Sequence, residues 1–333
     1  MRKPDFFLLG HPRSGSGQLN GYLARHPDLF MAKKELHYFG SDLGYHTPPR
    51  SEANFLSFFE GCPPDTRAGE ASTWYLFSER AAEEIQAFNP QSKVIALLRN
   101  PVDVLHSLHA HFVFRGDEDI PDFAEALAAE ADRAEGRRLP PYAIPRRGLE
   151  YSRLVRYAEQ LQRYFDVLGR DRVHVVINDD FRKDPQAVFR GVCQFLGVRD
   201  DYPGWDATFE EDQRARNANR TVYSRALQDF LIRPEQQQVL EAVRPAAVPG
   251  WRFILRALRR VNIKYVERAP MDPTLRAQLQ ARFAPEVRAV SELLGRELLQ
   301  EPAGGLELGL VGLLGADAGH GVFELAEVLG PGV

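Results

Sequence analysis

The sequence has 333 residues, of which 44% are hydrophobic, and it carries a formal net charge of −4. This length suits a single large α/β domain, and the apolar content is sufficient for a sizeable core. A protein that neutralises the phosphates of a polymer usually has a basic excess, so the slightly acidic balance argues against a nucleic-acid partner. The two cysteines are far apart and lack metal-ligand spacing, which argues against a disulfide framework and fits a reducing cytoplasm.

The N-terminal segment does not have the pattern of a secretion signal. Its apolar run spans only Phe6 to Leu9, which is too short for a signal-peptide core, and it leads directly into a glycine loop. No stretch reaches the roughly 18 consecutive apolar residues of a membrane span. We therefore expect a soluble, cytoplasmic protein.

Short apolar runs alternate with helical patterns through the first two thirds of the chain. This alternation is typical of a parallel sheet with helices on both faces, so the predicted fold class is α/β with three layers. The predicted strands cover 6–9, 29–31, 94–98 and 173–177, and the predicted helices begin near 19 and 101 and cover 151–168 and 185–196.

The remaining segments are less regular. Residues 113–148 are polar and rich in Pro and Arg around a predicted helix at 121–134, a composition that suits a mobile flap. The last third is predicted to be almost wholly helical. We expect one domain over residues 1–300, followed by a Gly- and Leu-rich extension over 301–333 with the composition of a disordered tail.

A glycine-rich loop follows the first predicted strand and reads GHPRSGSG from Gly10 to Gly17. In a strand–loop–helix unit the backbone N–H groups of the loop and the positive end of the helix converge on a phosphate. Gly10 and Gly15 have the spacing of the pattern GxxxxGK[ST], but Ser16 and Gly17 replace its lysine and its magnesium-binding hydroxyl residue. The loop contains Arg13 instead, which predicts direct cationic binding of a phosphate-like leaving group without a metal.

A second anion site is predicted where the strand at 94–98 ends. Arg99 follows this strand, and Ser107 lies eight residues later on the next predicted helix. A guanidinium offers both charge and a bidentate fork to phosphate oxygens, and a hydroxyl two turns into the helix adds a hydrogen bond from a fixed direction. The alternative is structural, with Arg99 capping the sheet edge and Ser107 packing on its helix.

Both loops resemble those of sulfotransferases that depend on 3′-phosphoadenosine 5′-phosphosulfate (PAPS). The family's first loop reads PKSGT or PRSGT, to which PRSGS at 12–16 is similar, and residues 98–107 resemble its second signature. The resemblance implies a P-loop-containing, nucleotide-kinase-like fold with a central parallel sheet and a helical C-terminal part. It also implies that the 3′-phosphate lies on Arg99 and Ser107, and that the 5′-phosphosulfate lies on Arg13, Ser14, Gly15, Ser16 and Gly17.

A third motif, KELHYF at residues 34–39, resembles the KExHFF segment of carbohydrate-type sulfotransferases and their bacterial relatives. The resemblance implies that Glu35 is the base that removes the acceptor's proton during in-line transfer. Lys33 and Lys34 would favour its ionised form. The alternative is a solvated charge cluster, and we expect His37 to pack in the core.

The segment GEASTWYL at 69–76 resembles the family's GEKSPSYL segment beside the cofactor. Ala71 replaces the usual lysine and Thr73 the usual proline. The resemblance implies that Ser72 donates a hydrogen bond to the cofactor and places Trp74 either near the adenine or in the core.

Further along the chain, the resemblance is looser. Residues 217–225 resemble a basic segment that closes over the 3′-phosphate, which makes Arg220 a candidate ligand and Arg225 its alternative. Residues 173–181 are interpreted as sheet structure without a site. The basic stretch at 251–268 is interpreted as a helix with a solvated face, the alternative being peripheral contact with an anionic lipid surface or acceptor.

The predicted function is therefore transfer of a sulfuryl group from PAPS to a hydroxyl or amine, with release of 3′,5′-ADP (PAP) and without a metal. The acceptor could be a small molecule, a glycan or a lipid. Two alternatives remain: a divergent P-loop kinase, disfavoured by Ser16 and Gly17, and a nucleotide-binding scaffold without turnover, disfavoured by the presence of Glu35.

Overall fold

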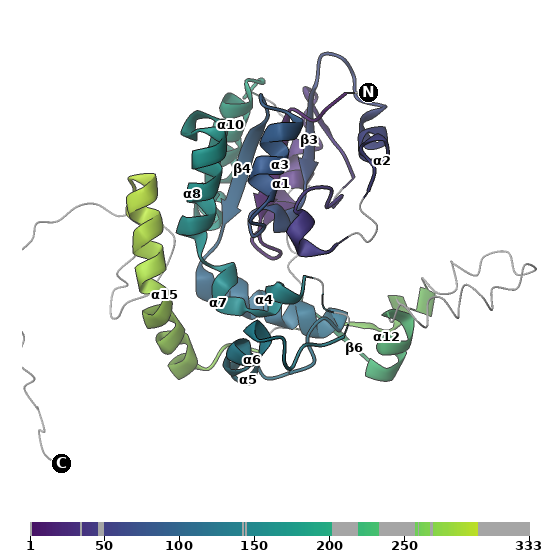
Figure 1. The fold of residues 1–333 in the computed structure, drawn as a ribbon, viewed down its shortest axis with the longest axis vertical. Coiled ribbons are helices and arrows are strands. Elements are labelled where there is room, and N and C mark those ends of the chain that lie inside the picture. The colour runs from purple at the N-terminus through teal and green to yellow at the C-terminus, as the bar shows by residue number, and fades with distance from the viewer. Residues whose placement is uncertain are drawn as a thin grey trace, which may run out of the picture.

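The structure is a computed structural model that describes residues 2–33, 35–45, 50–141, 143, 145–201, 219–232, 257–258, 260–266 and 269–298. A parallel sheet with helices packed on it forms the body, and α12 projects to one side beyond α4 (Figure 1). The predicted boundary between residues 1–300 and the extension at 301–333 lies outside the described residues.

Five parallel strands form the main sheet, in the order β2-β3-β1-β4-β5. Both β1 and β4 are central, and their apolar runs are buried as expected for strands covered on two faces. Gly10 at the end of β1 pairs with Leu97 near the end of β4, so the loops after these two strands leave the same edge of the sheet. The strands are β1 (Phe6–Gly10), β2 (Leu29–Met31), β3 (Arg67–Ala71), β4 (Lys93–Leu98) and β5 (Val173–Ile177).

Two hydrophobic clusters cover the two faces of this sheet. Successive side chains of a strand point to opposite faces, so Phe6 and Leu8 of β1 join one cluster while Phe7 and Leu9 join the other. The first cluster packs under α1 (Ser16–Leu23), α9 (Asn178–Lys183) and α10 (Pro185–Leu196). The second packs under α3 (Ala81–Phe88), α4 (Pro101–Arg115), α8 (Tyr157–Leu168) and α15 (Pro273–Leu294). The predicted three-layer α/β fold is confirmed.

The predicted helix at 151–168 is wrong in one respect, because the structure divides it into α7 (Tyr151–Leu154) and α8. The side-chain amide of Gln160 donates hydrogen bonds to the carbonyls of Arg153 and Leu154 at 3.2 and 3.1 Å. These bonds satisfy the end of α7 in place of backbone donors, so the chain can turn before α8 begins.

The prediction of an almost wholly helical last third is also wrong. An antiparallel pair, β6 (Asn219–Val222) and β7 (Ile263–Val266), joins segments more than forty residues apart, with Thr221 opposite Lys264. Valine, isoleucine, threonine and tyrosine in these short runs suit a strand. Helix α12 (Arg225–Ile232) follows β6, and β6 packs against α4.

The segment predicted to suit a mobile flap is folded around a buried ion pair. Arg133 contacts Glu118 at 2.7 Å with both side chains fully buried, and the Tyr151 hydroxyl donates to Glu118 at 2.8 Å. The predicted helix at 121–134 forms as two shorter ones, α5 (Phe123–Ala128) and α6 (Glu130–Ala134). Another short helix, α2 (Glu52–Leu56), lies between β2 and β3.

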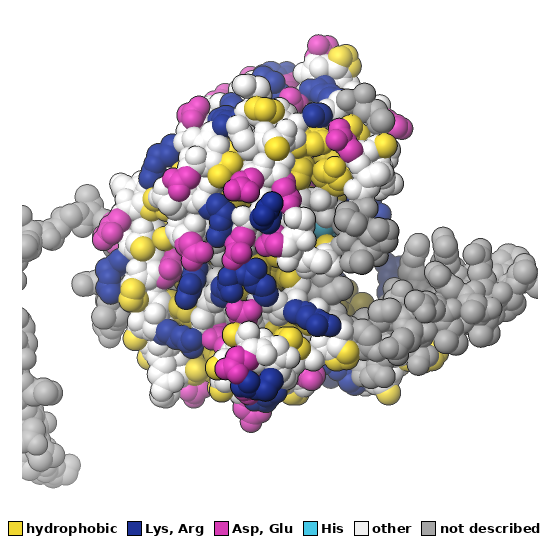
Figure 2. Space-filling model, viewed as in Figure 1, with side chains coloured by type: hydrophobic (Ala, Val, Ile, Leu, Met, Phe, Trp, Pro, Cys, Tyr) yellow, Lys and Arg dark blue, Asp and Glu magenta, His cyan; other side chains and the backbone are white. Residues whose placement is uncertain are grey.

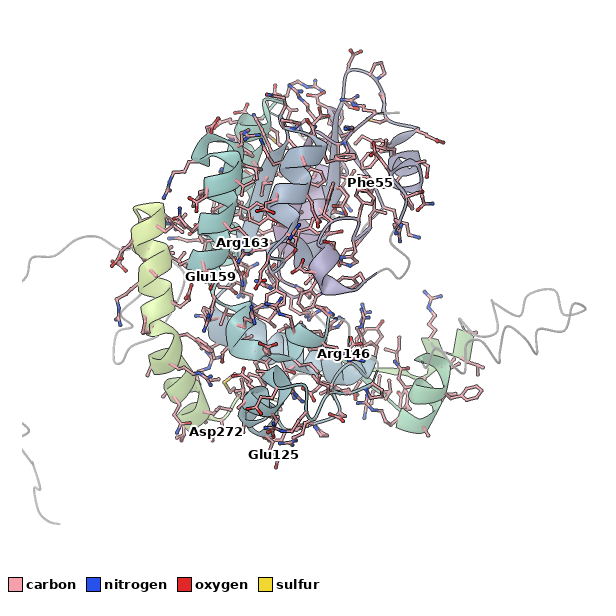
Figure 3. The ribbon with its side chains drawn as sticks, in the orientation of Figure 1. Phe55, Glu125, Arg146, Glu159, Arg163 and Asp272 are labelled. Atoms are coloured by element: carbon pink, nitrogen blue, oxygen red, sulfur yellow. The ribbon has the colours of Figure 1, made fainter. Side chains whose placement is uncertain are left out.

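Surface charges of both signs are interspersed on the face seen in Figure 2. Glu79 accepts hydrogen bonds from Arg147 and Arg153, each at 2.7 Å, and these bonds tie the segment before α8 to the segment after β3. Figure 3 shows Arg163 and Glu159 side by side on α8, where they pair at 3.3 Å. In the described part of the chain, no helix is both long and apolar enough to cross a membrane.

Candidate active site

The glycine loop after β1 is anchored to the end of β5. The Asn178 amide donates to the carbonyl of Ser14 at 2.8 Å. Gly15 has a φ of 105°, in the left-handed region, and a Cβ there would lie 2.4 Å from the Asn178 amide nitrogen. Glycine is therefore required by both conformation and space. Sequence reasoning assigned 173–181 no site, although a polar residue directly after a buried strand is a signal that could have marked Asn178.

Arg13 connects the two predicted phosphate loops. Its backbone has a φ of 75°, an uncommon conformation for a residue other than glycine. Its Nε donates to the Ser107 Oγ at 3.0 Å, and Arg99 Nη1 donates to the Arg13 carbonyl at 2.9 Å. Arg13 of the first predicted phosphate loop therefore lies together with Arg99 and Ser107 of the second.

Helix α4 places Arg99 and Ser107 relative to each other. The Asn100 side chain accepts the N–H groups of Val102 and Asp103 and caps the helix, and Pro101 occupies its first position. The Tyr157 hydroxyl donates to the Arg99 carbonyl at 3.0 Å. Burial lowers the pKa of Arg99, so an anion placed beside its guanidinium would offset the cost of desolvating that charge.

The other loop residues lie at the start of α1. Ser16 and Gly17 form its first turn, where helical N–H groups point toward the loop. Ser14 is buried, and its Oγ has no hydrogen-bond partner among the described residues. His11 Nε2 pairs with the Gln160 side chain at 2.9 Å, and burial lowers the pKa of His11 to about 4, so this neutral ring ties the loop to α8.

Glu35 lies in the loop after β2. Its Oε2 accepts a hydrogen bond from the Thr73 hydroxyl at 3.0 Å and lies 2.9 Å from His37 Nε2. The Glu35 side chain is 25% exposed. Lys33 is exposed, and Lys34 lies outside the described residues.

Ser72 and Glu70 on the neighbouring strand support this loop from behind. The Ser72 Oγ accepts the backbone N–H groups of Leu36 and His37 at 3.1 and 2.9 Å and donates to the Glu70 carboxyl at 2.5 Å. Complete burial raises the pKa of Glu70 to about 7, against the opposing hydrogen bonds from Ser72 and Leu36. The predicted contact of Ser72 with a cofactor stays a prediction, and its observed contacts position the Glu35 loop.

A cavity of about 540 Å³ opens beside Glu35. His37 lines it and stacks on the Tyr45 ring, with centroids 4.1 Å apart. The expectation that His37 packs in the core is therefore wrong, because its ring lines the cavity and contacts Glu35. Its backbone has a positive φ of 47°. The lining residues are Pro12, Glu35, His37, Tyr45, Trp74, His111, Phe112, Arg115 and Asp117.

The far wall of the cavity comes from the C-terminal half of α4. Burial, together with the charges of Arg13, Arg115 and Arg220, lowers the pKa of His111 to about 4. His111 is therefore neutral near pH 7. Arg115 contacts Asp117 at 2.8 Å, while burial raises the pKa of Asp117 against the effect of this guanidinium. Sequence reasoning missed this wall because its residues match no motif.

The late basic segment lies beside this wall. Arg220 is exposed on β6 with its guanidinium 5.8 Å from the Tyr265 ring centroid, and its charge contributes to the lowered pKa of His111. Arg225 donates to the Val113 carbonyl of α4. Within the described ranges, no group of three or more His, Cys, Asp or Glu side chains could hold a metal ion.

Comparison with known proteins agrees with this geometry. The model of the sulfotransferase domain family matches residues 3–223, so the chain belongs to the sulfotransferase domain family. Enzymes of this family use PAPS as donor and yield PAP. The crystal structure of a sulfotransferase from Alicyclobacillus acidocaldarius is 28% identical, with a TM-score of 0.64, and the match covers 90% of this chain and 98% of that one.

Curated relatives resemble a shorter part of the chain. Human bifunctional heparan sulfate N-deacetylase/N-sulfotransferase 2 is 25% identical over 212 residues, which cover 59% of this chain and 22% of that protein. The human protein numbered 1 in the same series is 26% identical over 211 residues, again 59% and 22%. The match thus spans about a fifth of the length of these relatives.

Proposed function

We propose that this chain is an active PAPS-dependent sulfotransferase that transfers the sulfuryl group to a hydroxyl or amine of an acceptor bound beside Glu35. The observation that carries the proposal is the contact of Arg13 with Ser107 and Arg99 directly beside the cavity, since the neighbouring Pro12 forms part of the cavity wall. Donor phosphates and acceptor would meet at this boundary.

On the donor side, Arg99 and Ser107 would hold the 3′-phosphate, with Arg220 as a further candidate ligand. Arg13, Ser14, Gly15, Ser16 and Gly17 would surround the 5′-phosphosulfate. As the bond from sulfur to the 5′-phosphate oxygen breaks, negative charge develops on the departing PAP. The Arg13 guanidinium and the N-terminal turn of α1 would stabilise that charge, so in this proposal the positive charge comes from the protein and not from a metal.

On the acceptor side, the acceptor oxygen or nitrogen would form the new bond to sulfur while Glu35 takes its proton. Thr73 and His37 contact the same oxygen of Glu35, which fixes the direction of the carboxylate. The backbone N–H groups of Leu36 and His37 donate hydrogen bonds to Ser72 Oγ, and these bonds support the loop that carries Glu35. Such prior orientation is where transfer reactions of this type gain much of their rate.

A calorimetric titration with PAP, run beside 5′-ADP and Mg·ATP, tests the donor site. Tight binding of PAP and weak binding of the other two would support both phosphate loops. Preference for Mg·ATP would replace the proposal with a divergent kinase. Binding of PAP without turnover of PAPS on any acceptor would replace it with a nucleotide-binding scaffold.

The basic stretch predicted at 251–268 is described only at 257–258 and 260–266. Arg260 and Lys264 are exposed there, next to Val261 and Tyr265, which are 76% and 61% exposed. Exposed cations beside exposed apolar groups suit the surface of an anionic membrane, and peripheral contact through this segment remains part of the proposal.

A further inference from the structure

Six successive backbone N–H groups follow Glu35 in the chain, and three side chains accept them two by two. The pairs are Leu36 and His37 on Ser72, Tyr38 and Phe39 on Tyr75, and Gly40 and Ser41 on Glu84, with distances in chain order of 3.1, 2.9, 2.8, 3.3, 2.6 and 3.4 Å. Ser72 and Tyr75 follow β3, and Glu84 lies on α3. These contacts therefore tie the loop to the sheet and to a helix packed on it.

We propose that Ser72, Tyr75 and Glu84 are positioning residues for sulfuryl transfer, because together they fix the backbone of residues 36–41 and with it the place of Glu35 at the cavity. The inference rests on the function proposed above, in which Glu35 is the base. It assigns the three side chains to the orientation of that base, without contact with the donor or the acceptor.

The backbone of this loop needs such support. Residues 35–40 form neither helix nor strand. His37 has a φ of 47°, which is uncommon for a residue with a Cβ and persists only where the surroundings over-determine it. Paired contacts hold the chain at His37 and on its C-terminal side, and the His37 ring lies 2.9 Å from the Glu35 carboxylate. The strained residue is thus part of the contact that directs the base.

Glu70 explains how a single hydroxyl can accept two N–H groups. A hydroxyl has two acceptor lone pairs and one proton, so a double acceptor must give its proton to a third group. Ser72 donates its proton to the fully buried Glu70 carboxyl at 2.5 Å, which leaves both lone pairs for the loop. The Tyr75 hydroxyl interacts with the same carboxyl, and burial raises the pKa of Tyr75, so this hydroxyl keeps its proton.

The order of the three pairs along the chain separates positioning from general stabilisation. The pair on Ser72 begins at the residue after Glu35, and the pair on Glu84 ends the series. A misplacement of about 1 Å can cost about 10²-fold in rate. Loss of the Ser72 pair should therefore slow transfer most and loss of the Glu84 pair least. A purely structural role would make the rate follow the loss of stability instead.

Amide hydrogen exchange on the full chain tests the contacts pair by pair and needs no acceptor molecule. Ser72→Ala, Tyr75→Phe and Glu84→Ala should each speed exchange mainly at the two N–H groups that the altered side chain accepts. Glu84→Gln keeps an acceptor oxygen and should retain the protection that Glu84→Ala loses. Equal exchange across residues 36–41 in all variants, or no change in any of them, would overturn the proposal.

The matched control for these variants is Ser291→Ala. Ser291 is a buried hydroxyl that accepts the backbone N–H of Leu298 at 3.1 Å, and it lies on α15 away from the loop. Its loss should leave both the exchange of residues 36–41 and the transfer rate unchanged. A variant that fails to fold would exchange along the whole chain, and the other two variants would then decide.

Release of PAP from PAPS in a single turnover, with water as the acceptor, measures the effect on transfer. The water oxygen bonds to sulfur, the bond from sulfur to the 5′-phosphate oxygen breaks, PAP leaves and Glu35 takes the proton. Ser72→Ala should slow this release about 10²-fold, Tyr75→Phe by a smaller factor and Glu84→Ala least, with the Kd for PAP unchanged in all three.

Two outcomes of this measurement would overturn the proposal. One is an equal fall in rate in the three variants, and the other is weaker PAP binding in Ser72→Ala, which would make Ser72 a cofactor ligand. Absence of PAP binding by the unaltered chain would instead remove the proposed function, whereas the exchange pattern decides by itself whether the three side chains hold the loop.

Discussion

The proposed donor side and the proposed acceptor side of this site are built in different ways. The donor side consists of loops that leave the ends of adjacent buried strands, β1 and β4. These loops are joined by side-chain hydrogen bonds, to the carbonyls of Arg13 and Ser14 and between Arg13 and Ser107. The acceptor side is assembled from the loop after β2, the segment after β3 and the far end of α4. The pairing of β1 with β4 brings the loops of the first arrangement together, whereas the second depends on how several segments pack.

Glu35→Gln is expected to have the largest effect, and it tests whether the acceptor side can fail while the donor side still binds. Removing a general base typically costs about 10²–10⁴-fold in rate. We expect kcat to fall by that factor while the Kd for PAP stays the same, because Glu35 belongs to the acceptor side. Single-turnover kinetics combined with calorimetry would measure both quantities. Full turnover in this variant would show that another group takes the proton.

Arg99→Ala should show the opposite pattern, in which PAP binding weakens because Arg99 belongs to the donor side. Loss of one side of a buried charge interaction costs about 2–5 kcal/mol, so PAP binding should weaken by that amount while 5′-ADP, which lacks the 3′-phosphate, changes little. Calorimetry with both nucleotides measures the difference. Exposed Arg80 offers a control for loss of a surface cation. Equal weakening of both nucleotides would contradict the assignment of the 3′-phosphate to Arg99.

Glu70, behind the Glu35 loop, should make the stability of the protein depend on pH. Its pKa in the folded state, about 7, is above the ordinary value of 4.5, so the folded protein holds more protons than the unfolded chain between these pH values. The free energy of unfolding should therefore decrease as pH rises from about 4.5 to about 7, by about 3 kcal/mol, and then level off. This contribution to stability is fully present only below about pH 4.5 and is lost as pH rises through about 7.

Glu70→Gln should remove this dependence, because an amide oxygen can still accept from Ser72 without ionising. Urea denaturation at pH 5 and pH 8 would measure the free energy of unfolding in both proteins. Glu60→Gln is the control, since Glu60 is exposed. If the variant kept the full slope, the pH dependence would have to come from another group.

The smallest effect is expected from Ser107→Ala. A hydrogen bond to a charged group is worth about 1.5–3 kcal/mol, and this variant removes the hydroxyl that Arg13 contacts. The affinity for PAP should fall by up to that amount, and the preference for PAP over 5′-ADP should narrow. Competition calorimetry detects both changes. An unchanged preference would indicate that Ser107 only orients Arg13.

Much of the donor side could be predicted because it depends on short-range patterns. Each of its patterns lies within a short stretch of sequence: the strand at 94–98, the glycine loop, and the eight-residue spacing from Arg99 to Ser107. Asn178 was not predicted as part of it, although it directly follows a buried strand, because only the pairing of β4 with β5 brings this residue to the carbonyl of Ser14. The split between α7 and α8 depended equally on the Gln160 side chain, which a helical pattern does not reveal.

The sequence by itself determined the α/β class, the order of the main elements and the cationic loop of a sulfotransferase domain, because buried strands and phosphate loops have local signatures. Only the tertiary structure decided the β6–β7 pair, the place of His37 and the cavity wall at Arg115 and Asp117. The physical reason is that these features arise from contacts between distant segments. Their energy comes from packing and burial, which no single stretch of sequence encodes.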